Sequence, residues 1–420
     1  MSKAATLWNR DFFLLWQGSV VSSLGSQAYS IALMLWAKQA TQSGTVVGAI
    51  LFAGGITSLL MPFGGVLADR YSRRRLLVQL DCLTGVSVLS LPLLFLALPE
   101  RSGFLIPAVL MMNFVRGACM ALFHPVASSL VPDLVDDAVL HRANSALQSA
   151  FRITSLFGQS VGGILFRLLG APLLFLIDGA SFLLSALSEW FIHEPHDPRP
   201  RPARAGILSD LKDGLRFTGR IPGFRIYLAE ASCVNFFMAS IPVGLPFLVE
   251  DVYHASVDWY GYLLAAMGFG AIAGALVAGR FPRPGALRGA LHIFSLIVLS
   301  SCMLPLSLVR TPWGALAVVT LCWGCVGFHQ VILSTLVQKR TPKSMRGRVS
   351  GLLAMIRFGL TPLGMAVFGA MIDLFEGRIV DILFWTGVAG LAIILWATSY
   401  RDYRSFFTGN EAEVAWDEGP

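Results

Sequence analysis

The chain has 420 residues, of which 55% are hydrophobic and only 14% are charged, and its mean hydropathy is +0.67. A soluble domain carries about 25% charged residues, so this composition excludes a soluble enzyme and a disordered chain. The apolar residues suffice for about eleven or twelve membrane helices of about 20 residues each. Their runs do not alternate with polar residues, which also excludes a membrane β-barrel.

Polar breaks divide the apolar runs into segments long enough to cross a membrane. The first run follows a charged start and has no cleavage site, so it is a retained helix rather than a signal peptide. The sequence therefore predicts an all-α membrane protein with twelve transmembrane helices. The predicted spans lie near residues 12–37, 45–68, 76–98, 104–130, 143–167, 172–192, 224–249, 258–280, 289–309, 312–336, 348–372 and 379–400.

The longest polar stretch separates the sixth predicted span from the seventh. It holds a Pro- and Arg-rich run, P-H-D-P-R-P-R-P-A-R-A, which is typical of a linker. The predicted organisation is a six-helix bundle over 1–193, a cytoplasmic linker over 194–223, a second six-helix bundle over 224–400 and a cytoplasmic tail over 401–420.

Lysine and arginine are divided unevenly between the two sides of the predicted spans. The loops that share a side with both termini hold 24 of the 32, and the opposite loops hold five. Because positive loops stay in the cytoplasm, we predict a multi-pass protein of a bacterial inner or plasma membrane with both termini cytoplasmic. The same asymmetry accounts for the net charge of +7 without a nucleic-acid partner.

The two halves of the chain share features at a nearly constant spacing. Residues 67–73 match 277–283 at an offset of 210, and His124 corresponds to His329 at an offset of 205. Matches that occur in the same order at one period indicate an internal repeat. The sequence therefore predicts two pseudo-symmetric six-helix bundles.

The loop after the second span reads G-G-V-L-A-D-R-Y-S-R-R-R-L from residue 64. Glycines allow close helix contact, an aspartate suits a helix N-terminus, and arginines anchor a loop to the cytoplasmic face; a purely topological role of the arginines is the alternative. The motif resembles the signature of the major facilitator superfamily, with Ser72 where glycine is usual, and that fold has two parallel six-helix repeats. The resemblance implies that the aspartate latches this loop to span eleven and stabilises the outward-facing state. The gating residues it implies are Gly65, Asp69, Arg70, Arg73 and Arg74.

The fifth span carries S-L-F-G-Q-S-V-G-G from residue 155. It resembles the exporter signature of the same family, with Ser155 in place of a glycine and Gln159 in place of the proline. The resemblance implies a hinge at which spans five and eight pack closely, and ordinary packing of small residues is the alternative. The hinge residues it implies are Gly158, Gly162 and Gly163.

Further segments extend the resemblance over nearly the whole chain. They include L-W-N-R-D-F-F-L-L-W at the start, R-A-N-S-A-L-Q-S after span four and S-M-R-G-R-V-S-G-L at span eleven. Together they look like the drug:proton antiporter branch, which contains macrolide-efflux proteins and the enterobactin exporter. The resemblance implies proton-driven efflux of an amphipathic small molecule, such as a drug, a siderophore or another natural product, and it names no single substrate.

Family architecture places spans one, four, seven and ten around the central cavity. Span four carries N-F-V-R-G, and a charge at this depth is costly, so it faces a cavity or a partner. A purely structural role for this arginine is the alternative. The candidate cavity residues are Gln27, Tyr29, Asn113, Arg116, Asn235 and Gln330.

Glu230 is the only carboxylate well inside these four spans, which makes it the first candidate for the proton carrier. A titratable group in a partly dehydrated cavity is suited to bind and release protons. An interfacial, snorkelling Glu230 is the alternative. His124 and His329 are the other candidates, with hydrogen-bonded packing as the alternative for each. The residues expected to form cytoplasmic gate bridges are Asp81, Arg152 and Arg357.

The motifs give no support to ATP-driven transport or to a metal site. No G-x-x-x-x-G-K-[ST] loop occurs, and H-E-P-H at 193–196 has the wrong spacing for zinc. We therefore expect no enzyme activity, cofactor or metal, and a monomeric secondary transporter in the lipid bilayer whose partners are a small molecule and protons. A proton-coupled importer, a lipid or lysolipid flippase of the same fold and a non-transporting receptor are the alternatives.

Overall fold

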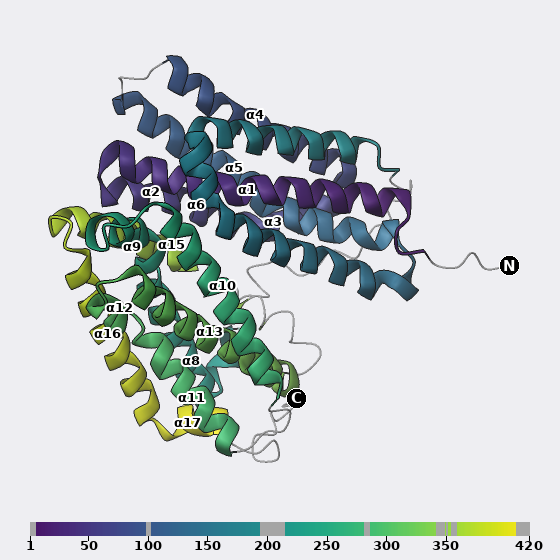
Figure 1. The fold of residues 1–420 in the computed structure, drawn as a ribbon. Helices are drawn as coiled ribbons and strands as arrows, with labels where there is room; N and C mark the ends of the chain where they lie inside the picture. Colours follow the sequence, from purple (N-terminus) through teal and green to yellow (C-terminus); the bar gives the residue numbers. More distant parts are fainter. Residues whose placement is uncertain are drawn as a thin grey trace. The chain divides into compact units, whose positions relative to one another are not determined.

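The computed structural model describes residues 6–97, 102–193, 215–280, 286–341, 349, 352–353 and 359–408. The chain divides into two compact units, Met1–Ala203 and Arg204–Pro420, which we call unit 1 and unit 2. Within the described residues all regular secondary structure is helical. Each unit is a bundle of helices (Figure 1).

Unit 1 begins with a helix whose first turn is capped by Asn9, because the Asn9 side chain accepts a hydrogen bond from the Phe12 amide. Asn9 Nδ2 also donates to the carbonyl of Leu134 at 2.6 Å. This bond joins the start of the first helix to the end of the helix that finishes at Leu134. The elements of unit 1 are α1 (Arg10–Thr41), α2 (Gly44–Ile56), η1 (Thr57–Leu60), α3 (Met61–Arg70), α4 (Arg73–Ala97), α5 (Ser102–Leu134) and α6 (Asp137–Trp190).

Unit 2 contains shorter and more interrupted helices. Thr311 caps one of them, with Pro312 at its first position, where a missing amide hydrogen costs nothing. The elements of unit 2 are α8 (Pro222–Met238), α9 (Ser240–Phe247), η2 (Leu248–Val252), α10 (Asp258–Gly279), α11 (Ala286–Ser300), α12 (Met303–Leu308), α13 (Pro312–Arg340), α15 (Thr361–Leu374), α16 (Ile379–Ser399) and α17 (Arg401–Thr408).

Ten of the described helical segments are long and apolar enough to cross a membrane, against the twelve expected from the sequence. The fifth and sixth expected spans lie on the two sides of a kink within α6, where Gly170 has a non-helical backbone with φ of 70° two residues before Pro172. Part of the eleventh expected span lies outside the described residues, and its described end is the 14-residue helix α15. The structure therefore establishes a multi-span helical membrane protein and not the count of twelve.

Within each unit, two equivalent helices approach each other closely at glycine residues. A Cβ at Gly117 of α5 would lie 2.8 Å from the carbonyl oxygen of Gly54 in α2. In unit 2, a Cβ at Gly274 of α10 would overlap the carbonyl of Gly324 in α13. These pairs are the second and fourth spans of each half, so the same close backbone approach recurs in both.

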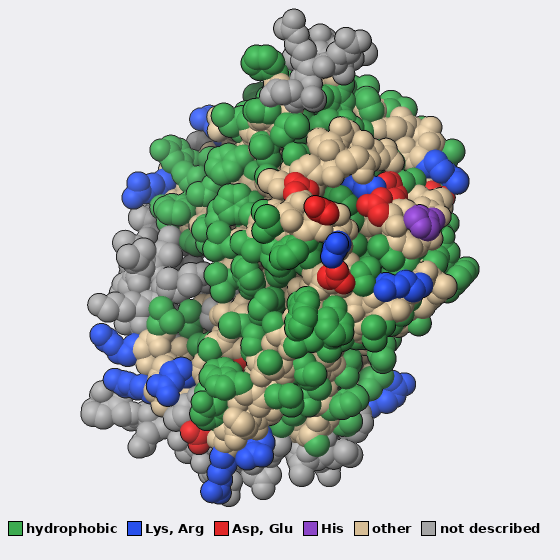
Figure 2. Space-filling model, turned by 90° about the vertical axis from the view of Figure 1, so that its left-hand side faces the viewer, with side chains coloured by type: hydrophobic (Ala, Val, Ile, Leu, Met, Phe, Trp, Pro, Cys, Tyr) green, Lys and Arg blue, Asp and Glu red, His purple; other side chains and the backbone are tan. Residues whose placement is uncertain are grey.

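The surface of the described residues is rich in large apolar side chains. Phe104, Trp313 and Trp385 are among the exposed ones. Figure 2 shows a face on which hydrophobic side chains cover most of the described surface, while charged side chains gather in separate patches. Apolar surface on this scale suits contact with lipid rather than water.

Residues 401–408 lie in the predicted cytoplasmic tail and are folded. They form α17, which packs against the start of α8 and places Tyr403, Phe406 and Phe407 in the core of unit 2. Gly223 permits this approach, because a Cβ there would overlap the backbone of Asp402. Three aromatic side chains in an eight-residue polar segment are buried together, which the local composition alone did not indicate.

Candidate functional site

An ion pair lies in the interior of unit 1. Arg116 on α5 places its Nε 3.3 Å from Oδ2 of Asp178 on α6, and the Asp178 side chain is fully buried. The sequence predicted a partner or a cavity for Arg116, and the structure supplies the partner. Asp178, in the sixth predicted span, is the residue that binds this guanidinium.

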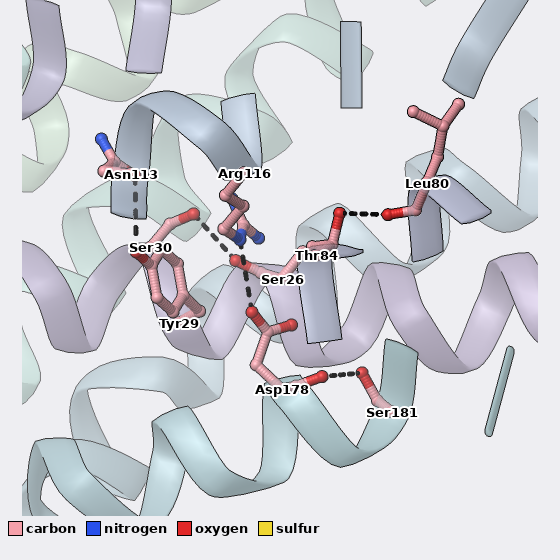
Figure 3. A network of polar contacts seen from close by, with 9 residues as sticks. All are labelled: Ser26, Tyr29, Ser30, Leu80, Thr84, Asn113, Arg116, Asp178 and Ser181. Atoms are coloured by element: carbon pink, nitrogen blue, oxygen red, sulfur yellow. Dashed lines mark hydrogen bonds and ion pairs between the residues drawn. The ribbon is translucent and has the colours of Figure 1, made fainter. Parts of the chain in front are cut away.

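Tyr29 on α1 completes this site. The Arg116 guanidinium carbon lies 4.2 Å from the centre of the Tyr29 ring, a cation–π distance. The Tyr29 hydroxyl donates to Oδ1 of Asn113 at 3.4 Å, and Nδ2 of Asn113 donates to the carbonyl of Ile50 at 2.7 Å. Figure 3 shows these side chains converging from α1, α5 and α6. Three of the predicted cavity residues therefore form one network.

Glycine on α1 makes room for this network. A Cβ at Gly25 would lie 2.8 Å from Oδ1 of Asp178 and 2.5 Å from Oγ of Ser181. The absence of a side chain lets α1 approach α6 at the level of the ion pair. The neighbouring Gln27 is half-buried, and its side chain fills the space beside Gly158.

The glycines of the exporter-like motif pack inside unit 1. A Cβ at Gly158 would overlap Gln27, and a Cβ at Gly162 would overlap Ile31, both on α1. The expected partner was span eight. That packing stays a prediction; within unit 1 these two glycines lie against span one, because α6 packs directly on α1. Gly163 is buried in the same helix.

The second buried site lies in unit 2 around Glu230. This glutamate is 1% exposed, so it is an interior residue rather than a snorkelling one. Its Oε2 has no hydrogen-bond partner among the described residues. The Tyr403 hydroxyl of α17 lies beside the carboxyl, outside the geometry of a formed hydrogen bond.

His329 belongs to the same region of unit 2. Its Nε2 lies 3.3 Å from the hydroxyl of Tyr227, and its ring stacks on that of His292 with centroids 4.9 Å apart. Phe407 of α17 covers His292, with ring centroids 4.4 Å apart. Tyr227 lies three residues before Glu230 on α8, so both occupy one face of that helix.

The remaining predicted residues of this group are His124, Asn235 and Gln330. His124 is half-buried, with its ring against Phe151 at a centroid distance of 5.2 Å. Asn235 donates to the carbonyl of Ala231 one turn earlier on its own helix, at 2.7 Å. Gln330 is half-buried on α13. The pseudo-symmetric histidines thus have different surroundings.

The arginine-rich loop is tied to the ends of neighbouring helices. Arg73 pairs with Asp133 at the end of α5 and also donates to the carbonyl of Ala68. Arg74 donates to the carbonyls of Trp190 and Ile192 at the end of α6. These bonds fix the loop within unit 1, which is more than a topological role.

The remaining motif residues are less constrained. Gly64, and not Gly65, makes the close contact, because a Cβ there would lie 2.7 Å from the carbonyl of Leu122. Asp69 and Arg70 are exposed at the end of α3. The latch partner expected for Asp69 at the start of span eleven lies outside the described residues.

Among the described residues, the two expected gate charges Asp81 and Arg152 are not brought together. Asp81 is buried on α4 beside the hydroxyl of Ser185, whereas Arg152 is exposed on α6. Arg357 lies outside the described residues. Sequence reasoning missed Glu189, which is fully buried near the end of α6. A helical spacing of polar residues through Asp178, Ser185 and Glu189 was the available signal.

The helices are long enough to cross a membrane and form two bundles. Each bundle holds buried charged residues among its helices. These features define a polytopic membrane protein of the transporter type. The sequence profile of the Major Facilitator Superfamily matches residues 15–365. The chain therefore belongs to the Major Facilitator Superfamily, and it is a transporter rather than an enzyme.

Similar proteins share most of its length. The multidrug efflux pump Tap of Mycobacterium tuberculosis (strain ATCC 25618 / H37Rv) is 24% identical over 384 residues, which cover 86% of this chain and 87% of Tap. The enterobactin exporter EntS of Escherichia coli O1:K1 / APEC is 27% identical over 367 residues, covering 84% and 82%. A solved D-xylose-proton symporter shares the fold with a TM-score of 0.68 at 15% identity, covering 95% of this chain and 100% of that one.

Proposed function

We propose that this protein exports an amphipathic small molecule from the cytoplasm by alternating access, driven by the proton gradient. The observation that carries the direction is the similarity to two exporters, Tap and EntS, over more than four fifths of the chain. The substrate class is a drug, a siderophore or another natural product. The charge asymmetry of the loops supports cytoplasmic termini.

Glu230 is the proposed proton carrier. It is the buried acid of unit 2 whose Oε2 has no hydrogen-bond partner among the described residues, and a buried ionised carboxylate without compensation is costly. Protonation removes that cost, so the site suits a group that binds and releases a proton during the cycle. His329 and His124 are the alternative carriers, and Tyr227 supports His329 by its contact with Nε2.

The motif residues supply the conformational part of the proposal. Asp69 acts as the latch of the outward-facing state, and the anchoring of Arg73 and Arg74 supports a fixed loop from which it acts. Gly158 and Gly162 act as hinge positions, where close packing on α1 leaves no side chain in the way. The transporter works as a monomer in the cell membrane.

Import by proton symport is the second candidate. The fold is shared with a D-xylose-proton symporter, and at 15% identity that likeness concerns the fold alone. A lipid flippase of the same fold is the third. Whole-length similarity to exporters favours export over both.

Everted membrane vesicles test the proposal. Respiring vesicles that contain the protein should accumulate radiolabelled erythromycin, tetracycline or enterobactin. Addition of the transported compound should also lower their pH gradient. The gradient is followed with an acridine dye, and vesicles without the protein are the control. Absence of accumulation over the whole panel would count against export, and accumulation only in right-side-out vesicles would indicate import.

A further inference from the structure

A stripe of buried polar residues runs along one face of α6. Asp178, Ser181, Ser185 and Glu189 follow one another at intervals of three or four residues, and all four are buried. This spacing keeps them on one side of the helix. At a rise of about 1.5 Å per residue, the stripe extends about 16 Å, from the Arg116 ion pair to the end of α6 beside Arg74.

Neighbouring helices seal this stripe. A Cβ at Gly18 of α1 would lie 2.9 Å from Oγ of Ser185, so α1 touches α6 at this level. On the α4 side, a Cβ at Gly85 would lie 3.0 Å from the carbonyl of Gly179. Close backbone contact on both sides keeps lipid and bulk water away from the stripe.

Asp81 of α4 faces the stripe at Ser185. Asp81 is 1% exposed, and its carboxyl lies beside the Ser185 hydroxyl. Glu189 lies one turn after Ser185 on the same face of α6. The Glu189 carboxyl lies in the electrostatic field of the Asp81 carboxyl.

The pair lacks the compensation that Asp178 has. Neither oxygen of Glu189, nor Oδ2 of Asp81, has a hydrogen-bond partner among the described residues, and no described Lys or Arg forms an ion pair with either. The Ser185 hydroxyl is fully buried and has no formed hydrogen bond either. The ionisable groups nearby are Cys82 on α4, Cys119 on α5 and Asp178 on α6. Two arginines are also nearby. Arg116 binds Asp178, and Arg74 binds the carbonyls of Trp190 and Ile192.

We propose that Asp81 and Glu189 form a carboxyl pair that holds one shared proton, and that this pair is a proton-binding site of unit 1 separate from Glu230. Two adjacent carboxylates inside a protein cannot both stay ionised, whereas one proton between them gives a neutral carboxyl that donates to its ionised partner. The Ser185 hydroxyl is placed to donate to whichever oxygen carries the charge. As a step in transport, the site rests on the proposed proton-driven function.

Infrared spectroscopy of the purified protein tests the pair without any substrate. The difference between the wild-type spectrum and that of the double variant D81N/E189Q should contain one protonated and one ionised carboxyl at neutral pH. On titration the two should appear as two separate steps, and D81N or E189Q alone should leave a single step. A difference that contains two ionised carboxylates, or two protonated carboxyls at neutral pH, would overturn the proposal.

Two controls accompany this experiment. Asp137→Asn, at an exposed carboxyl in the first turn of α6, should leave the buried-carboxyl signal unchanged. Replacing choline chloride by sodium chloride in the buffer should also leave the buried-carboxyl signal unchanged. A signal that depends on sodium would mean that the pair binds sodium, which would overturn the proton site. Should the double variant fail to fold, labelling of the wild type with dicyclohexylcarbodiimide gives the same decision. The reagent attacks protonated buried carboxyls, so peptide mapping should find Asp81 or Glu189 labelled at neutral pH and unlabelled at strongly alkaline pH.

These measurements separate the pair from the proposed function. Absence of transport in vesicles with an intact infrared signal would reject proton-driven export and keep the proton site. Transport in vesicles, together with an absent infrared signal, would reject the proton site and keep proton-driven export.

Discussion

Arg116 and Asp178 form an ion pair at 3.3 Å inside unit 1, with the aromatic ring of Tyr29 on the guanidinium at 4.2 Å. Removing two charges from water is expensive, and the pair persists because the two charges compensate each other and the Tyr29 ring face stabilises the Arg116 guanidinium. The same unit holds Asp81 and Glu189 without such a cation. Unit 1 thus separates a structural charge pair from an uncompensated pair of acids.

Asp178→Asn should destabilise the protein strongly, because it leaves the Arg116 charge buried and unpaired. Breaking a buried pair in this way costs about 3–5 kcal/mol. The double variant Arg116→Met with Asp178→Asn should recover most of the loss. Apparent melting temperatures in detergent, followed by tryptophan fluorescence, measure both, with Asp137→Asn as the exposed control. A single variant as stable as the wild type would contradict a structural role of the pair.

Substitutions of Tyr29 should separate its two contacts. Tyr29→Phe keeps the ring on Arg116 and loses only the long hydrogen bond to Asn113, a loss of about 1 kcal/mol. Tyr29→Leu also removes the cation–π contact, worth about 2 kcal/mol when desolvated, so its melting temperature should fall further. Equal melting temperatures of the two variants would indicate that the ring contributes nothing to holding Arg116.

Glu230→Gln should abolish the response of transport to the proton gradient. Glutamine keeps the size of the buried side chain and cannot release a proton, so substrate binding should persist while gradient-driven accumulation in everted vesicles is lost. Glu376→Gln, at an exposed loop position, is the matched control. Full gradient dependence in Glu230→Gln vesicles would remove Glu230 as the carrier and leave the histidines.

Gly274→Val should disrupt the contact between α10 and α13. The new side chain would meet the backbone carbonyl of Gly324, which cannot move aside without displacing its helix. Overpacking of this kind costs about 1–3 kcal/mol or more. Gly279→Ala, at the open end of the same helix, should leave the melting temperature unchanged, since no atom lies within 4 Å of the added Cβ.

Phe406→Ala should show that α17 belongs to the folded core of unit 2. The Phe406 ring stacks on Phe224 with centroids 5.2 Å apart and is buried. Loss of a buried phenylalanine costs about 3–5 kcal/mol. Arg401→Ala, exposed on the same helix, is the control. Equal stability of the two variants would mean that α17 is an appendage.

Much of the fold follows from the sequence, because long apolar runs have few solutions in a bilayer. Hydropathy located the membrane-length helices, and a lone carboxylate in an apolar run identified Glu230, whose burial the structure then showed. The family motifs identified the loop that Arg73 and Arg74 fix. Each of these signals is local, so it can be read along one helix or one loop.

Pairing between helices was decided only by the tertiary structure. Arg116 and Asp178 lie 62 residues apart in the sequence. Their contact depends on the glycine residues that set the distance and the register between neighbouring helices. Glu189 lies near the end of α6, and the packing of α1 and α4 against that helix accompanies its burial. Composition determines that such a chain enters a membrane as helices. Only the register between those helices determines which buried charges find a partner and which remain without one.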